Sequence, residues 1–489
     1  MTLRSSLGWS FTEEFGKKVL HLAGSVIIAR LLTPDEMGVF ALAVAVHSVI
    51  GSVQHFGISQ YLVREQTLSD DKIRSAFGVW LIVAWGLALS LLSVRGVVAD
   101  LYETPGIASV LAVIALSFFL IPFGEPARAL LMREMRFDLI NHVMLTSAAI
   151  KLAATVGFAV LGWSYMALAW GMLLGTAVQS VLFLALRPRH VRLRPSLQHG
   201  RAICRFGGWL TGASIAGNVN VEGQKFVLGG LLNPAAVALY DRAVQVPSIF
   251  RMSLLMPIGR VLFPAFAEDI REGRRIGPKV ETFVAINTVL VWPAFLTAAL
   301  VAEPLIVFVF GENWRMAGHI LPFLLVSQGM LAFLPQPETI LVPHGKVARV
   351  FAVRTFAVVN GLSFGVAGAM HSLMMFAYLR PAATVLFLGV LTLAMFRLMD
   401  VPAARLLRHY ASAAAVAVVS ALPAFVIAQR HGPDMALSDL AIALFAAPPI
   451  WLGMLFVLRH PLAGEIAFLA GAARGRLSAT LRRRRVPQE

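Results

Sequence analysis

The sequence predicts an all-α polytopic membrane protein of about 14 transmembrane helices, in two pseudo-repeated six-helix lobes followed by two C-terminal helices. Three observations indicate this fold: the composition, the recurrence of long apolar stretches, and the placement of Lys and Arg in alternate loops. Hydrophobic residues make up 58% of the 489 residues, charged residues only 14%, and the mean hydropathy is +0.75. Soluble domains carry about a quarter charged residues, so the chain is typical of a membrane protein.

Apolar stretches long enough to cross a membrane recur from end to end, since a transmembrane helix needs about 20 mostly apolar residues. No short apolar core followed by a small-residue cleavage site stands at the N-terminus, so we expect the first stretch to remain as a transmembrane helix. The fourteen expected helices lie in residues 12–32, 37–62, 76–98, 106–125, 139–161, 164–186, 206–232, 239–266, 281–302, 317–342, 348–368, 372–396, 406–428 and 438–458.

The basic residues indicate the orientation of these helices. RPRHVRLRP at 187–195 and REGRRIGPK at 271–279 both follow even-numbered helices, whereas the opposite loops, such as ADLYETP at 99–105, are acidic or neutral. Cytoplasmic loops carry the excess of Lys and Arg, so both termini are expected in the cytoplasm. The C-terminal LRRRRVPQE fits an end near anionic membrane lipids, and a plain topology signal explains it equally well.

An internal repeat predicts the lobes. IIARLLTPDEMGVF at 27–40 aligns without a gap with VLGGLLNPAAVALY at 227–240, 200 residues later. Six helices separate the copies, so both face the same way in the membrane, as in transporters built from parallel repeats; a chance match between apolar segments is the alternative. We therefore expect an N-terminal lobe in 1–200, a C-terminal lobe in 201–400, two additional transmembrane helices in 401–460 and a basic cytoplasmic tail in 461–489.

Polar side chains follow one face of the expected helix 206–232. Thr211, Ser214, Asn218, Glu222 and Lys225 recur at intervals of three or four residues, which places them on one stripe of a helix. A charged side chain at a helix centre costs about 2.5–3.5 kcal/mol to insert, and usually faces a bundle interior or a watery cavity. We expect Thr211, Ser214 and Asn218 to form a polar cavity face.

Helix 139–161 repeats this arrangement with Ser147, Lys151 and Thr155 at intervals of four. Basic residues outnumber acidic ones at membrane depth, and a cationic cavity between apolar walls attracts an anionic solute. The candidate substrate-binding cations are Lys151, Lys225, Arg380, Arg30 and Arg354. Two carboxylates, Glu222 and Asp241, are the ion-coupling candidates. Glu222 and Lys225 are three residues apart, so a neutralising pair on the helix surface is the alternative for them.

The sequence contains no motif for a cofactor, a metal or covalent catalysis. A P-loop, a zinc-spaced His/Glu cluster and a GxSxG nucleophile elbow are all missing. Cys204 is the single cysteine, which excludes an intramolecular disulfide and a Cys-based metal cluster. The net charge of +16 is spread over short loops rather than gathered on one polar face, so nucleic-acid binding is not expected. We expect no cofactor, no metal and no catalytic residue.

Three stretches resemble the Wzx-type oligosaccharide flippases of bacterial polysaccharide synthesis, a branch of the multidrug/oligosaccharidyl-lipid/polysaccharide exporter superfamily. These are ARLLTPDEMGVFALA at 29–43, FVLGGLLNPAAVALYDRA at 226–243 followed by PIGRVLFPAF at 257–266, and PLIVFVFGENW at 304–314. Relatives often carry Asp just before the FVLGGLL-like stretch, where this sequence has Glu222 followed by Gly223. The resemblance therefore does not carry a charge role onto Glu222.

The resemblance implies transfer of an undecaprenyl-diphosphate-linked oligosaccharide across the bacterial inner membrane, by alternating access driven by an ion gradient or the membrane potential. It implies a central cationic cavity, contact with membrane lipids, and cooperation with a polysaccharide polymerase and export machinery. The glycan is not implied, since exopolysaccharide, capsule and O-antigen synthesis all use such carriers.

Two other functions are weighed against this one. A cation-coupled multidrug exporter of the same superfamily is expected to have a carboxylate-rich site, whereas this sequence has an excess of cations at membrane depth. A membrane polysaccharide polymerase or ligase is expected to need a sizeable outward loop, and the longest one here is at about 303–316.

Overall fold

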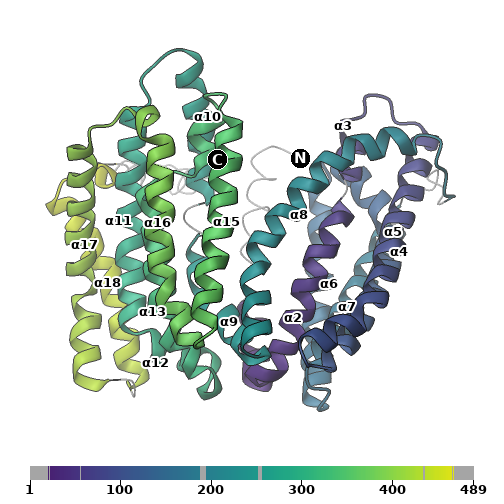
Figure 1. Ribbon diagram of the computed structural model, residues 1–489, viewed down its shortest axis with the longest axis horizontal. Coiled ribbons are helices and arrows are strands. Elements are labelled where there is room, and N and C mark those ends of the chain that lie inside the picture. Colours follow the sequence, from purple (N-terminus) through teal and green to yellow (C-terminus); the bar gives the residue numbers. More distant parts are fainter. Residues whose placement is uncertain are drawn as a thin grey trace, which may run out of the picture. The chain divides into compact units, whose positions relative to one another are not determined.

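The computed structural model describes residues 20, 22–55, 57–187, 194–251, 256–432, 435–464 and 466, without the side chains of 54–55, 205–217, 220 and 256–263. Within these residues the chain is helical and has no strand, which confirms the predicted all-α class (Figure 1). The chain folds as two compact units. Unit 1 comprises Met1–Asp241 and Val309–Trp314, and unit 2 comprises Arg242–Phe308 and Arg315–Glu489.

Unit 1 is built from long helices joined by short turns. Helix Leu22–Leu31 comes first, followed by α2 (Pro34–Gly51), η1 (Ser52–His55), α3 (Ile58–Arg64), α4 (Asp70–Leu101), α5 (Gly106–Arg133), α6 (Phe137–Val160), α7 (Met166–Ala185), α8 (Gly200–Leu231) and the start of α9 (Pro234–Phe250). Close packing joins α4 to α5, α5 to α7, α6 to α7, and α2 to α8.

Unit 2 continues from the second half of α9. Its elements are α10 (Met256–Arg271), α11 (Gly277–Leu300), α12 (Ala302–Phe310), η3 (Glu312–Trp314, counted with unit 1), α13 (Arg315–Met330), η4 (Leu331–Phe333), α14 (Pro337–Leu341), α15 (Val347–Ala369), α16 (Leu373–Met399), α17 (Ala403–His431) and α18 (Leu437–Val457). Indole and phenol groups fasten its core: the Trp451 indole donates to the Val289 carbonyl at 2.8 Å, and the Tyr410 hydroxyl to the Phe333 carbonyl at 2.8 Å.

The two copies of the sequence repeat begin their helices in the same way. The Thr33 hydroxyl accepts the Glu36 amide at 3.4 Å at the start of α2, and the Asn233 side chain accepts the Ala236 amide at 2.8 Å at the start of α9. Both helices have Pro next, at 34 and 234, where its missing N–H costs nothing. The offset of 200 residues is therefore matched by an equivalent N-cap.

The second copy packs directly on the first within unit 1. A methyl group on Gly38 would lie 1.9 Å from the Pro234 carbonyl oxygen, and one on Gly229 would lie 2.4 Å from a Leu42 methyl. Glycine at these positions lets α8 and the 232–234 turn approach α2. By packing, α8 thus lies with unit 1, whereas the repeat places residues 201–400 in a C-terminal lobe; that lobe boundary stays a prediction.

The expected helix 37–62 is broken in the structure. Gly57 has φ +66°, a left-handed conformation that favours glycine, and it separates η1 from α3. After the break, Ile58 and Leu62 of α3 are buried together with Trp80 of α4 in one apolar cluster.

Eleven helices of the described residues are long and apolar enough to cross a membrane. Helix lies in each of the fourteen expected stretches, but the first is described only in part, and α8 and α9–α10 are not among the eleven. A multi-pass membrane protein is confirmed, and the count of about 14 spans stays a prediction.

Candidate functional site

An ion triad joins α8 to α9 in unit 1. The Lys225 ammonium lies 3.1 Å from the Glu222 carboxylate and 3.0 Å from the Asp241 carboxylate. Glu222 is one turn before Lys225 on α8, and Asp241 lies on α9 at the same level, because the 232–233 turn is about equally far from 225 and 241 along the chain. The side chains of Lys225 and Glu222 are 15% and 11% exposed, and that of Asp241 is 35% exposed.

The triad changes the interpretation of Lys225. Its ammonium was a candidate substrate-binding cation, but two carboxylates face it, so the ionised triad has an excess of one negative charge. Both ion-coupling candidates, Glu222 and Asp241, are brought to the same lysine. Asp241 is the most exposed of the three side chains.

Of the predicted polar face of α8, only Asn218 can be placed. Its amide donates to the Ser48 carbonyl of α2 at 3.2 Å. The contact ties the middle of α8 to α2. The side chains of Thr211 and Ser214 lie outside the described residues.

Lys151 lies on α6 with its stem against α7. A methyl group on Gly175 would lie 2.7 Å from Lys151 Cβ, and one on Gly171 would lie 1.9 Å from the Thr155 hydroxyl. Small residues four apart let membrane helices approach closely. Ser147 and Thr155 are 5% and 1% exposed: they fill this seam, and each hydroxyl donates to a carbonyl of its own helix.

The Lys151 side chain is exposed in the structure. In the part of the chain that the structure describes, no carboxylate lies within 4.0 Å of its ammonium. Lys151 therefore differs from Lys225, which has two carboxylate partners.

The unit 2 candidates divide in the same way. Arg354 is held by the Glu338 carboxylate through two hydrogen bonds, of 2.6 and 2.8 Å. Arg380 lies over the Phe376 ring at 5.9 Å, and its Nη1 is buried with no hydrogen-bond partner among the described residues. Arg354 is thus engaged in an ion pair, and Arg380 retains a buried donor.

Arg30 lies at the end of the first helix, in unit 1. Its Nε donates to the Val309 carbonyl at 3.3 Å, and the buried Trp314 indole donates to the Ala29 carbonyl at 2.7 Å. Residues 309–314 are thereby fastened to the end of that helix, and Arg30 is part of this junction.

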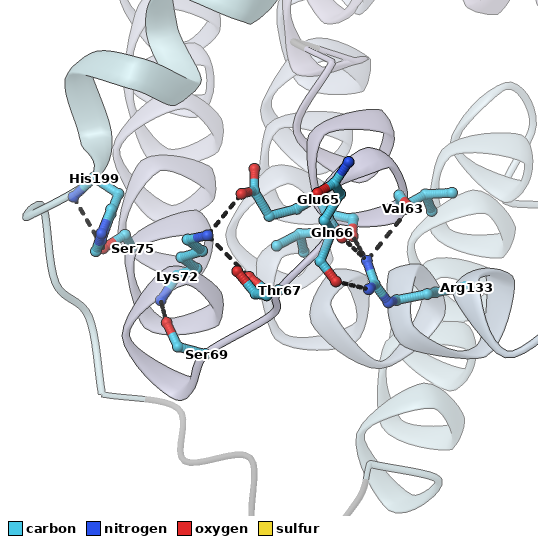
Figure 2. Close-up of polar contacts among 10 residues, drawn as sticks. Val63, Glu65, Gln66, Thr67, Ser69, Lys72, Ser75, Arg133 and His199 are labelled. Carbon is cyan, nitrogen blue, oxygen red and sulfur yellow. Dashed lines mark hydrogen bonds and ion pairs between the residues drawn. The ribbon is translucent and has the colours of Figure 1, made fainter.

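A polar cluster that sequence reasoning missed lies at the expected cytoplasmic end of unit 1 (Figure 2). The Arg133 guanidinium at the end of α5 donates to the Leu62 carbonyl in the last turn of α3 at 2.8 Å and to the Gln66 carbonyl, beyond the end of α3, at 3.2 Å. Lys72 of α4 reaches the Glu65 carboxylate at 2.6 Å and the Thr67 carbonyl at 2.9 Å. The ion pair lowers the pKa of the Glu65 carboxyl, chiefly through the hydrogen bond from Lys72.

A second missed pair lies on α5. Arg128 holds the Glu125 carboxylate at 2.8 Å, and the Ser59 hydroxyl of α3 is 3.5 Å from the same carboxylate. The spacing of three residues between 125 and 128 is the sequence signal that could have found it. In the described part of the chain, no group of three or more His, Cys, Asp or Glu side chains is placed to hold a metal ion.

Comparison with known proteins identifies what this architecture resembles. The profile of a family described as polysaccharide biosynthesis protein matches residues 27–318. The lipopolysaccharide biosynthesis protein WzxC of Escherichia coli (strain K12) is 26% identical over 322 residues, which are 65% of this chain and 65% of WzxC. The succinoglycan biosynthesis transport protein ExoT of Rhizobium meliloti (strain 1021) is 26% identical over 371 residues, 74% of each chain.

Among solved structures, the lipid II flippase MurJ in an inward closed conformation matches with a TM-score of 0.73 and 12% sequence identity, over 92% of this chain and 99% of that one. At this identity the likeness shows the fold. The match with WzxC covers just under two thirds of that relative's length.

Proposed function

This chain belongs to the polysaccharide biosynthesis protein family, and on that premise we propose that it translocates a lipid-linked oligosaccharide, carried on undecaprenyl diphosphate, from the inner to the outer leaflet of the bacterial inner membrane. The observation that carries the proposal is the family match over residues 27–318. The named activities of the relatives, in lipopolysaccharide and succinoglycan synthesis and in lipid II flipping, support the substrate class.

The cations at membrane depth supply the chemistry for an anionic substrate. Lys151 and Arg380 are the substrate-binding candidates in this proposal, since neither is in an ion pair with a described carboxylate. Lys225 and Arg354 have carboxylate partners, and Arg30 fastens the 309–314 segment.

Energy for transport enters at Glu222 and Asp241 in this proposal. Two carboxylates that share one ammonium can bind one proton or one small cation without creating a net positive charge in an apolar region. The ion gradient or the membrane potential then drives the change in access. Moving one elementary charge across the membrane potential supplies about 2.3 kcal/mol per 100 mV. The chain works as a transporter and not as an enzyme, and the polymerase and export machinery use its product.

The experiment that tests the function is deletion of the gene. Cells lacking it accumulate lipid-linked repeat units on the cytoplasmic leaflet, and the wild-type gene restores export. Unchanged export in the deletion strain contradicts the proposal. If instead the deletion strain is sensitive to cationic drugs, the wild-type gene restores its growth on them, and export does not change, the result supports the drug exporter.

The orientation, with both termini in the cytoplasm, has its own test. Cys204 is the only cysteine and is exposed at the start of α8, on the expected cytoplasmic side. A membrane-impermeant maleimide labels it in inside-out vesicles and not in intact spheroplasts. The S164C/C204S variant, whose cysteine lies in the turn before α7, gives the opposite pattern. Labelling of Cys204 from outside contradicts the orientation.

A further inference from the structure

The chain makes a tight turn after α18, in unit 2. Arg459 has a left-handed backbone with φ +49°, and the His460 amide donates to the Leu455 carbonyl in the last turn of α18 at 2.9 Å. Residues 461–464 are helical again. The first residues of the expected cytoplasmic tail therefore begin a new helix, and His460 stands between it and α18.

The His460 side chain caps this new helix. Its Nδ1 accepts the Leu462 amide at 3.2 Å, and its backbone carbonyl accepts the Ala463 amide at 2.9 Å. Pro461 comes first in the helix, as is common directly after an N-cap. Ser, Thr, Asp or Asn usually provides this cap. Histidine differs from them because its ordinary pKa is close to neutral pH.

Apolar packing holds the capped segment on unit 2. Ala463 is 6% exposed and lies in one buried cluster with Val289 of α11 and Val416 of α17, and Leu462 packs against the same cluster. His460 itself is 5% exposed. The cap thus lies within the packing that docks the segment.

Only the neutral form of the His460 ring can make this cap. Because Nδ1 accepts a hydrogen bond, the ring proton is on Nε2, which is buried. A second proton would turn Nδ1 into a donor and leave no acceptor for the Leu462 amide. Burial, and next the charge of His409, lower the pKa of His460 below its usual value near 6.5.

No described carboxylate lies within 4.0 Å of the His460 ring to stabilise its charged form. The Glu281 carboxylate of α11 is 3.2 Å from the Arg405 guanidinium and 3.9 Å from the His409 ring, both on α17. The charged and titratable groups at this end of the three helices are Glu281 on α11, Arg405, Arg408 and His409 on α17, and Arg459 after α18, while Glu465 lies outside the described residues.

We infer that His460 is a pH-sensitive cap, which docks the segment 461–464 on unit 2 while the ring is neutral and releases it when the ring is protonated. Release returns the pKa of the ring from its lowered value to the usual one. Docking is therefore complete above about pH 6.5 and weakens, by up to about tenfold per pH unit, as the pH falls below it. With the tail in the cytoplasm, as expected, acidification of the cytoplasm loosens the attachment of the tail.

Amide hydrogen exchange of the full chain in detergent, read by mass spectrometry on peptides that cover 461–464, tests the cap. H460N is the matched variant, since Asn caps a helix well and does not titrate. The measured quantity is the exchange rate of the wild type divided by that of H460N at the same pH, which removes the intrinsic effect of pH on exchange. This ratio is compared at about pH 7.5 and about pH 5, on either side of the ordinary pKa of histidine.

The ratio is expected to rise about tenfold from the higher pH to the lower. H460A, which has no cap, exchanges about fivefold faster than the wild type at the higher pH. H409N removes the neighbouring histidine and keeps the pH dependence, and H460S serves as the non-titrating cap if H460N does not fold. An equal ratio at the two pH values, wild-type protection in H460A, or loss of the pH dependence in H409N overturns the inference.

This inference goes beyond the proposed function and does not depend on it. Hydrogen exchange is measured without substrate, so a failed cap leaves the export phenotype of the deletion strain unexplained by nothing new. Conversely, unchanged export in that strain contradicts the proposed function and leaves the exchange result as it stands.

Discussion

Lys225 and Lys151 are two lysines at membrane depth in the same unit, and their surroundings are opposite. Lys225 on α8 lies between the carboxylates of Glu222 and Asp241, at 3.1 and 3.0 Å. Lys151 on α6 has no carboxylate within 4.0 Å of its ammonium among the described residues. A count of basic residues in the sequence treats the two alike, but only Lys151 has an ammonium available to an anion.

The difference comes from the turns that follow the two helices. The 232–233 turn brings Asp241 of α9 level with Lys225. The α6–α7 hairpin brings Gly171 and Gly175, which have no side chain to offer, level with Lys151. Lys225 therefore has two carboxylate partners, and Lys151 has none among the described residues.

The largest expected effect comes from removing the paired lysine. K225Q leaves two carboxylates close together in an apolar setting, and breaking a buried ion pair from one side costs about 3–5 kcal/mol. The midpoint of thermal unfolding in detergent therefore falls steeply. K151Q removes an unpaired charge and leaves this midpoint near that of the wild type. A similar loss in both variants contradicts the contrast between the lysines.

The next effect concerns the α6–α7 seam that holds the Lys151 stem. G171A places a methyl group against the Thr155 hydroxyl and the Lys151 carbonyl, at 1.9 and 3.1 Å, and overpacking of this kind costs about 1–3 kcal/mol. Thermal unfolding of G171A is compared with that of G157A, a matched glycine of α6 with open space around it. G157A is expected to equal or exceed the wild type in stability. Equal midpoints for the two variants mean that the seam is not tight.

A smaller effect on stability, with a larger one on transport, is expected for E222Q. The variant keeps the Lys225–Asp241 pair, so the free energy of unfolding changes by about 0.5–1.5 kcal/mol, the net worth of one hydrogen bond. Transport slows because only one carboxylate remains to take up the coupling ion. Export by E222Q in the deletion strain is measured at matched protein levels in the membrane. Normal export assigns Glu222 a structural role only.

The smallest effect belongs to an exposed pair in unit 2. Arg275 donates to Asp400, at 2.5 and 3.0 Å, in the loop between α16 and α17, and lowers the pKa of that carboxyl below its usual value near 3.8. A carboxyl with a lowered pKa in the folded state contributes stability above its unfolded pKa and loses it as the pH falls through the folded value. D400N is therefore slightly less stable than the wild type at pH 7, and the difference shrinks only as the pH falls below the usual value near 3.8 and through the lowered folded pKa. A difference that does not shrink over this acid range contradicts the ion-pair account.

Much of the fold could be predicted because it follows from local chemistry. Apolar length gives the helices, and Thr33 and Asn233, each followed by Pro, mark the starts of α2 and α9. The break between η1 and α3 was missed because the stretch is apolar throughout, and only the left-handed conformation of Gly57 reveals it.

The site was predictable in its residue types but not in its pairing. The Glu222–Lys225 pair follows from a spacing of three residues, whereas the Asp241 contact depends on the position of the following turn. The spacing of Ser147 and Thr155 shows that they share one face of α6, but not that each hydroxyl donates to a carbonyl of its own helix, or that Thr155 packs against Gly171.

We propose that Lys151, which has no carboxylate partner among the described residues, binds the anionic part of a lipid-linked substrate during its transfer. This role is tested by the leaflet distribution of lipid-linked repeat units in deletion-strain cells that express K151Q, K151R or the wild type at equal levels. Accumulation on the cytoplasmic leaflet is expected with K151Q, and export near the wild-type rate is expected with K151R. Normal export by a correctly inserted K151Q would rule out this role of Lys151.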